Sequence, residues 1–409
     1  MRVRSLLIGL ITLVVVASGC DWPQLGDGPT HTGFISDTGI TTTNVGTLHQ
    51  VWLSAGIAQA ANRAPQVVVA DGRVFARDGT NVLRALDDAS GDERWTAAYG
   101  GVAAVANQVM YAELAPQPHP EVVALQARNL DGSIAWSDLF VASALLFPGD
   151  AVVSAGQLFV TWTGLGASVG LQRYDASNGA TDTTTGTFGT PGTVNTPAAS
   201  GAMVYVTTTD GILHALSATD LRQEAWEASV PAGGVPSIDS GRVYISSGNS
   251  VMAFDAAGQA NCAPSATTTV CTPLWTATTS DTLSQQAPAV GSGIVAVRSD
   301  THLFALDPST GTARWSAVIG STAQAPQSLG SPSIEHGVVF VGSLDGALDA
   351  FDAAGSMNCS GAPTTCTPLK SVPLVGPTGA SQPAIANGNV YIGALDVARQ
   401  AAFTYKLGL

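Results

Sequence analysis

Residues 338–352 contain the pattern that decides the fold, and they read Val-Val-Phe-Val-Gly-Ser-Leu-Asp-Gly-Ala-Leu-Asp-Ala-Phe-Asp. Two runs of apolar and small residues flank a turn at Asp345-Gly346. Such runs are typical of β-strands packed on both faces, and Asp-Gly favours a tight hairpin because it tolerates positive φ. The stretch therefore predicts antiparallel strands over 338–342 and 347–351. Related turn pairs at Asp78-Gly79, Asp210-Gly211 and Asp300-Thr301 predict similar hairpins.

The same phrase recurs along the chain. A related copy begins at Val204 and closes at Trp226. The apolar run is preceded by the degenerate pair Asn107-Gln108 in one unit, and by glycine in seven others: Gly72, Gly156, Gly201, Gly241, Gly293, Gly337 and Gly388. A spacing of about 45 residues is typical of the four-stranded blade of a β-propeller.

The two ends of the chain predict how the ring closes. The last unit has strands near 390–393 and 402–407 but no fourth strand, whereas residues 49–53 resemble an orphan fourth strand. Trp52 stands there in the place that other units give to Trp95, Trp136, Trp226, Trp275 and Trp315, which we expect to pack between blades. The predicted fold is all-β, an eight-bladed propeller of four-stranded antiparallel blades, closed by an N-terminal strand that completes the last blade.

Composition excludes one class of partner. The chain has 409 residues, a net charge of −14, 11% charged residues and only two lysines, Lys370 and Lys406. Binding to a nucleic-acid backbone needs clustered Lys and Arg, so we expect no nucleic-acid partner.

The N-terminus predicts export. Arg2 and Arg4 precede an apolar run over residues 6–16, which is shorter than a membrane span but typical of a signal peptide. Residues 17–20, Ala-Ser-Gly-Cys, resemble a bacterial lipobox in which Cys20 is lipidated; the alternative is ordinary cleavage after Gly19. We therefore expect a signal peptide (1–19), a lipidated lead-in (20–48) and a propeller (49–409), anchored by lipid to the outer face of the cytoplasmic membrane or, in a diderm, to the outer membrane.

The other four cysteines form two local pairs in similar sequence contexts. The first pair is Cys262 and Cys271, and the second is Cys359 and Cys366. In each pair the second cysteine is followed by Thr-Pro-Leu. Their spacing does not suit a zinc site, and no nearby histidine completes a ligand set. In an exported protein this predicts the disulfides Cys262–Cys271 and Cys359–Cys366.

The repeat, together with Asp21-Trp22-Pro23-Gln24 and residues 30–34 before it, resembles the pyrroloquinoline-quinone (PQQ) type β-propeller family over residues 21–409. The resemblance implies either a quinoprotein dehydrogenase or a non-catalytic lipoprotein of the BamB type, which scaffolds outer-membrane protein assembly. The dehydrogenases use adjacent disulfide-bonded cysteines, a tryptophan platform, and Ca²⁺ held by Glu, Asn and Asp beside an Asp base. This chain has no adjacent cysteines and no such ligand set is identifiable, so we expect no cofactor, no metal and no catalytic residue.

Three other features carry little catalytic signal. Residues 166–170 match Gly-x-Ser-x-Gly, but they lie at a predicted strand-to-strand hairpin, where a nucleophile elbow needs a strand-to-helix turn. Asp87, Asp88, Asp92 and Glu93 are interpreted as a solvated turn. No two of the six histidines form a metal-like pair in sequence.

The favoured function is a non-catalytic protein-binding scaffold at the bacterial cell envelope, with envelope proteins as partners. Two alternatives stay open: a quinone- or small-ligand-binding propeller, such as a PQQ-dependent oxidoreductase, and a carbohydrate- or cell-wall-binding module. The candidate partner surface is Leu145, Leu146 and Phe147 in a loop expected over residues 141–149. The alternative for these residues is a plug over the channel.

Overall fold

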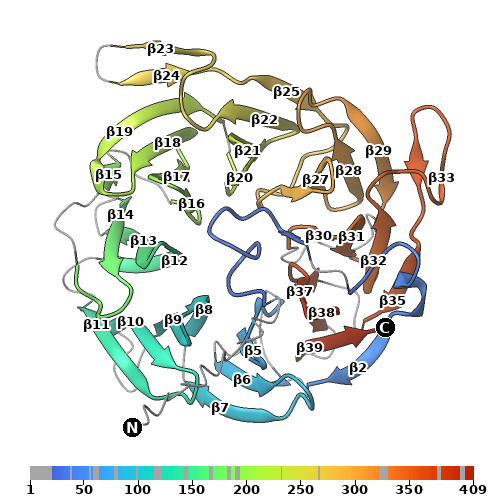
Figure 1. Cartoon of the computed structure of the whole chain (residues 1–409), viewed down its shortest axis with the longest axis horizontal. Coiled ribbons are helices and arrows are strands. Elements are labelled where there is room, and N and C mark those ends of the chain that lie inside the picture. Colours follow the sequence, from blue (N-terminus) through green and yellow to red (C-terminus); the bar gives the residue numbers. More distant parts are fainter. Residues whose placement is uncertain are drawn as a thin grey trace, which may run out of the picture.

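The computed structural model describes residues 21–36, 39–54, 57–58, 64–77, 82–97, 100–114, 122–141, 146–164, 169–181, 186–188, 194–231, 233–265, 268–321, 330–374, 379–396 and 401–409. Eight antiparallel sheets surround a central axis as blades, each with strand a innermost and strand d outermost (Figure 1). The predicted eight-bladed, all-β fold is confirmed. In the described ranges the only helical element is the 3-10 turn η1 (Val45–Thr47).

Blades 1 to 4 follow one another in chain order. From strand a to strand d they are β4 (Val67–Ala70), β5 (Arg73–Arg77), β6 (Leu83–Asp87) and β7 (Glu93–Ala97); β8 (Gly100–Ala106), β9 (Val109–Leu114), β10 (Val122–Asn129) and β11 (Ile134–Val141); β12 (Leu146–Ser154), β13 (Gln157–Gly164), β14 (Val169–Asp175) and β15 (Gly186–Phe188); and β16 (Ala198–Ser200), β17 (Met203–Thr208), β18 (Ile212–Ser217) and β19 (Asp220–Ser229).

Blades 5 to 8 complete the ring, and the last takes its strand d from the N-terminal side. They are β20 (Ser237–Asp239), β21 (Arg242–Ser247), β22 (Ser250–Asp255) and β25 (Trp275–Thr278); β26 (Ala289–Gly291), β27 (Ile294–Arg298), β28 (His302–Leu306) and β29 (Ala313–Val318); β30 (Ser333–Glu335), β31 (Val338–Gly342), β32 (Ala347–Asp352) and β35 (Lys370–Pro373); and β37 (Ala384–Ala386), β38 (Asn389–Asp396), β39 (Ala401–Gly408) and β2 (His49–Leu53). Three short strands add to blades 7 and 8: β1 (Phe34–Ile35) pairs with β30, β36 (Gly379–Ala380) with β38, and β3 (Ile57–Ala58) with β39.

The predicted b–c hairpins form at Asp210-Gly211, Asp300-Thr301 and Asp345-Gly346, whereas Asp78-Gly79 lies outside the described residues. Gly211 and Gly346 have φ of 87° and 80°, as expected for the turns that contain them. At Asp300-Thr301 the hairpin forms without positive φ at either residue. There the Ser299 hydroxyl oxygen accepts hydrogen bonds from the backbone N–H groups of residues 301 and 302, at 3.2 and 2.9 Å, and this side chain supports the turn instead.

Each pair of neighbouring blades meets at an interface, called a seam here. Tryptophans stabilise six of these eight seams. In each seam the indole Nε1–H of a strand d donates to a carbonyl oxygen in the c–d turn of the next blade, at 2.8–3.1 Å. The donor and acceptor pairs are Trp52 and Asp88, Trp95 and Leu130, Trp136 and Ala176, Trp226 and Ala256, Trp275 and Pro308, and Trp315 and Ala353. The predicted packing of tryptophan between blades is confirmed.

Each indole lies against a glycine of that same turn. A Cβ built on Gly258, for example, would lie 2.2 Å from Trp226, and Gly258 has a φ of 66°. Each of these tryptophans therefore requires a glycine in the c–d turn of the next blade. A side chain on that residue would collide with the indole, and glycine adopts the positive φ of the turn without strain.

The two seams without a tryptophan use a cation. Between blades 3 and 4, the guanidinium of Arg173 donates to the carbonyl of Ala218 at 2.8 Å. In blade 7, Lys370 occupies the register position of the tryptophan, and its ammonium donates to the carbonyl of Gly46 at 3.1 Å. A long cationic side chain can fill the slot and still satisfy a carbonyl.

The ring closes as predicted, through the N-terminal strand. β2 is antiparallel to β39, with Trp52 opposite Lys406. Three residues of blade 8 then meet Asp88 of blade 1: Trp52 through the backbone carbonyl, Lys406 at 2.8 Å from the carboxylate, and the Tyr391 hydroxyl, which donates to the same carboxylate oxygen. Asp88 was expected only as part of a solvated turn, so this role was missed.

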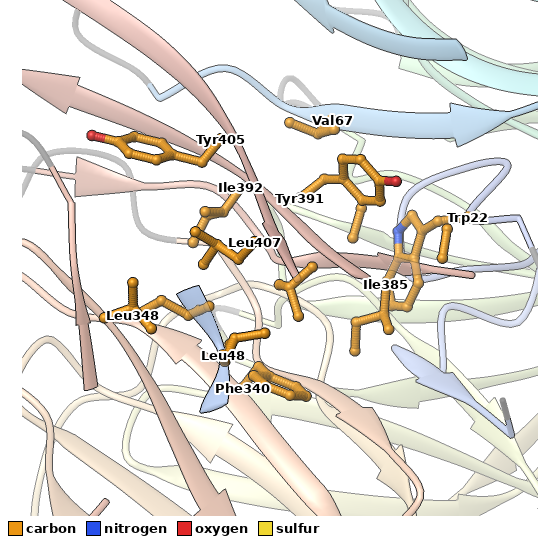
Figure 2. Packing of buried hydrophobic residues seen from close by; sticks show 14 of the residues in the cluster. Trp22, Leu48, Val67, Phe340, Leu348, Ile385, Tyr391, Ile392, Tyr405 and Leu407 are labelled. Carbon is orange, nitrogen blue, oxygen red and sulfur yellow. The ribbon is translucent and has the colours of Figure 1, made fainter. Parts of the chain in front are cut away.

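The largest apolar cluster lies at the same closure. It combines side chains of blades 7, 8 and 1 with residues before β2, including Trp22 and Leu48. Figure 2 shows Trp22 and Leu48 among Tyr391, Leu407 and Phe340. Burial of this cluster supplies hydrophobic stabilisation where the chain ends meet.

Both predicted disulfides are present, and each closes a hairpin arm in a c–d connection. Cys262 and Cys271 join β23 (Cys262–Pro264) to β24 (Thr269–Cys271), and Cys359 and Cys366 join β33 (Cys359–Ser360) to β34 (Thr365–Cys366). Each arm leaves its own blade and pairs in parallel with strand d of the preceding blade, β24 on β19 and β34 on β29. The arms therefore extend blades 4 and 6 to six strands and link neighbouring blades.

Among the described residues, no helix has the length and apolar character needed to cross a membrane.

We predict that Asp88→Ala lowers the free energy of unfolding by about 2–3 kcal/mol, because it leaves Lys406 and Tyr391 without their shared carboxylate. Urea unfolding followed by tryptophan fluorescence measures the change. Asp92→Ala is the matched control in the same turn, since the carboxylate of Asp92 is exposed and bonds only to Ser90, and it should cost less than about 0.5 kcal/mol. Equal effects of the two substitutions would contradict the closure role of Asp88.

Candidate functional site

The segment over residues 21–36, called here the axial segment, lies inside the ring (Figure 1). It meets the inner strands of blades 1 to 7 in order. Its backbone bonds to Val69, Val105, Ala199, Ile238, Val290 and Ile334, and the Gln24 side chain bonds to Val153. Each of these residues lies one pair from the a–b turn of its blade. The segment is therefore an internal brace of the ring.

These contacts give the propeller two distinct poles. The a–b pole carries the a–b and c–d turns, the axial segment and both disulfide arms, and the b–c pole carries the b–c and d–a connections. Asp21 starts the axial segment at the a–b pole, where its carboxylate accepts the backbone N–H of Asp71 at 3.2 Å. Residue 20 therefore precedes a residue that is fixed to this pole.

The axial segment also holds two unusual titratable side chains. Burial raises the pKa of Asp27 to about 7. Burial lowers the pKa of His31 to about 4, against a smaller opposite effect of a hydrogen bond to Pro236. Nδ1 of His31 has no hydrogen-bond partner in the described part of the chain. His31 is therefore neutral near neutral pH, whereas Asp27 holds its proton for about half of the time at pH 7.

The candidate partner residues lie differently from the expectation. β11 ends at Val141 and β12 begins at Leu146, so Leu146 and Phe147 belong to a strand, and their backbones pair with Gly164 and Thr163. The expected loop over 141–149 is therefore wrong in its extent, because the hairpin pairing of β12 with β13 continues further toward the b–c pole. Leu145 lies outside the described residues.

Other expected sites are resolved only in part. Cys20 and Ser168 lie outside the described residues. The Gly-x-Ser-x-Gly match joins β13 to β14, which are antiparallel strands, as expected. In the acidic run, Asp87 accepts hydrogen bonds from residues 89 and 90 and pairs with Arg94, and this pairing with Arg94 holds the pKa of that carboxyl well below its usual range.

Sequence reasoning missed two histidine–carboxylate contacts on the strands. Nδ1 of His214 lies 2.6 Å from a Glu224 carboxylate oxygen, and Nδ1 of His302 lies 2.7 Å from Asp281. The His214 contact joins strands c and d of one blade across a β-bulge, which simple alternation of residues does not signal. The His302 contact joins a d–a connection to the first residue of β28, and no local pattern signals it.

The family model described as "Outer membrane protein assembly factor BamB" matches residues 37–180 and 119–394, well over half of the chain. The chain belongs to this family. The match begins just after the axial segment. No sequence among the curated proteins matches the chain.

Solved structures with a fold similar to this chain include a BamB protein and two alcohol dehydrogenases. BamB from Moraxella catarrhalis matches with a TM-score of 0.58 and 15% identity, over 88% of this chain and 98% of that one. The quinohemoprotein alcohol dehydrogenases of Pseudomonas putida HK5 and Comamonas testosteroni match with TM-scores of 0.67 and 0.66, at 13% and 15% identity. They cover 95% and 96% of this chain, which covers 80% and 81% of theirs. At these identities the likeness shows the fold alone.

The cysteines and tryptophans of this family member do not fit a quinone as the dehydrogenases hold it. The four described cysteines form the two hairpin disulfides on the outer strands, with no adjacent pair. All eight tryptophans lie in the described ranges, none is exposed, and six of them fasten seams. Trp22 and Trp162 take no part in the seams and are buried, so the surface lacks the exposed tryptophans that would favour a carbohydrate-binding module.

The raised pKa of Asp27 predicts a pH-dependent stability. Between about pH 4 and 7 the folded state holds a proton that the unfolded state has lost, so Asp27 makes stability fall as pH rises. Asp27→Asn should have almost no effect at pH 4 and should stabilise the protein by about 2–4 kcal/mol at pH 8. His31 has the opposite sign in both backgrounds, since its lowered pKa makes stability rise with pH over about pH 4 to 6.5.

Urea unfolding of the wild type and of Asp27→Asn at pH 4, 6 and 8 measures this difference. Asp131→Asn is the control: Asp131 is exposed, and its hydrogen bonds to Ser133 lower its pKa, so the substitution should bring no gain at pH 8. The same effect of Asp27→Asn at pH 4 and pH 8 would contradict the raised pKa.

Proposed function

We propose that the chain is a non-catalytic protein-binding scaffold of the bacterial cell envelope, held to a membrane by a lipid on Cys20. Membership of the BamB family supports a scaffold, since the family description names an outer-membrane protein assembly factor. The two disulfides support export to an oxidising compartment. Envelope proteins are the proposed partners.

The observation that carries the proposal is the attachment of Asp21 to the a–b pole. A lipid on the preceding residue would hold that pole toward the membrane. The axial segment and the disulfide arms also lie at that pole. The b–c pole would then face away from the membrane, and it is the face we assign to partners.

Leu146 and Phe147, at the b–c end of β12, are the proposed centre of this partner face. Leu146→Asp should abolish capture of the partner while leaving the melting temperature nearly unchanged. The measurement is in-cell crosslinking followed by affinity purification of the full-length lipoprotein. Met357→Asp is the matched control, because Met357 is 43% exposed in the disulfide arm at the opposite pole.

Each failure of this test has a clear meaning. A large loss of thermal stability in Leu146→Asp would assign these residues to the core and remove them from the partner face. Equal loss of capture in Met357→Asp would contradict the assignment of the b–c pole. Unchanged capture in both variants would contradict it as well.

The alternative is a quinone- or small-ligand-binding propeller, favoured by its likeness to the two alcohol dehydrogenases. Because four cysteines form the arm disulfides, none of them adjacent to another, and six tryptophans occupy the seams, we predict that protein supplied with PQQ and Ca²⁺ oxidises no alcohol or sugar in a dye-linked assay. A quinoprotein dehydrogenase in the same assay is the positive control. Activity above the protein-free background would overturn the scaffold proposal.

A further inference from the structure

Blade 4 gathers three potential metal ligands on the face that meets blade 3. His214 lies in β18, and Glu224 and Glu227 lie in β19. One ligand atom from each of the three side chains lies within 4.8 Å of the other two, and all three residues are half-buried. Nδ1 of His214 is 2.6 Å from Glu224 Oε1.

The strand register explains how two glutamates reach one histidine. His214 is directly opposite Glu227, whereas Leu216 is opposite Glu224, and a β-bulge between these pairs accommodates the extra residue Ala225. Side chains two apart on β18 share a face, so the bulge brings Glu224 to the same face as Glu227. The ring of Phe188 from blade 3 lies 4.4 Å from the His214 ring and covers this side.

Blade 1 shows what the same positions do elsewhere in the repeat. There Arg84 is opposite Thr96, and Leu86 is opposite Glu93 across an equivalent bulge. Arg84 and Glu93 form an ion pair at 2.8 Å, so one cation balances one carboxylate. In blade 4 a histidine replaces the arginine and a second carboxylate, Glu227, replaces the threonine.

The charges of blade 4 are therefore unbalanced. In the part of the chain that the structure describes, neither Glu224 nor Glu227 pairs with Lys or Arg. A proton on His214 could balance one carboxylate but not both. A divalent cation balances both, and half-buried carboxylates without a cation are unfavourable.

Thr208 gives the second ring nitrogen of His214 a hydrogen-bond partner. The Thr208 oxygen lies 3.3 Å from Nε2, and its hydroxyl also reaches the Asp210 carboxylate. Without an ion, the 2.6 Å contact requires Nδ1–H to donate to Glu224, because a carboxylate only accepts. A metal ion would take the place of that proton on Nδ1, and Nε2–H would then donate to the Thr208 oxygen, an arrangement typical of metal-binding histidines.

We propose that His214, Glu224 and Glu227 bind one divalent transition-metal ion, with Zn²⁺ as the type that suits one imidazole and two carboxylates. The ion would fasten strands c and d of blade 4 beside the seam from blade 3, whose strand d contains no tryptophan. This site is independent of the proposed scaffold function.

The test is titration of Zn²⁺ into the metal-stripped full-length protein, purified without a polyhistidine tag, by isothermal titration calorimetry. We expect one Zn²⁺ per chain and a rise in melting temperature on binding. Glu227→Gln, which keeps the shape of the side chain, should weaken binding more than about tenfold, and His214→Gln should abolish it.

His302→Gln is the matched control. Its ring makes the same kind of contact, at 2.7 Å to Asp281, but no second carboxylate joins that pair in the described ranges. Its Zn²⁺ affinity should equal that of the wild type. Absence of Zn²⁺ binding in the wild type, or binding that survives both His214→Gln and Glu227→Gln, would overturn the proposal. A Glu227→Gln variant with the wild-type melting temperature before Zn²⁺ is added shows that a lost signal is not unfolding.

Discussion

Closure of the ring at Asp88 is the constraint on which the rest of the structure depends. A propeller is a circular sheet array, and an open last blade would leave unpaired strand edges and an exposed apolar seam. Here three strands of blade 8 reach one residue of blade 1, through Trp52, Tyr391 and Lys406. The chain's other lysine, Lys370, fastens the preceding seam to Gly46. Both lysines therefore stabilise the blade that joins the two ends of the chain.

The repeat made the fold predictable from the sequence, because each blade is a local unit with its own hairpin turns. The strands over 338–342 and 347–352, the closing strand with Trp52 and both cysteine pairs follow from such short-range patterns. The repeat pattern does not show which residue each side chain contacts in the folded ring. A glycine and a tryptophan that are neighbours in the phrase serve different seams, since Gly258 contacts Trp226 of the blade before.

The features that the sequence did not reveal depend on contacts between blades or on local irregularities of a strand. The axial segment bonds to six blades through backbone groups, which carry no residue signature, and to blade 3 through the side chain of Gln24. The arms pair with a neighbouring blade through parallel strands, again by backbone alone. In the candidate site, His214 and Glu224 meet because a bulge changes which face Glu224 occupies, and strict alternation of residues would place it on the other face.

The two poles of the ring then acquire different roles from the same topology. The inner strands beside the short a–b turns hold the axial segment, and the disulfide-closed c–d arms lie at the same pole, so this pole is committed to structure. The b–c and d–a connections can vary in length without disturbing those contacts, because the backbone bonds of the axial segment lie near the a–b turns. Loops carried on a rigid frame are where binding surfaces usually develop. A propeller braced at one pole is therefore free to vary the other, which is the property a scaffold requires.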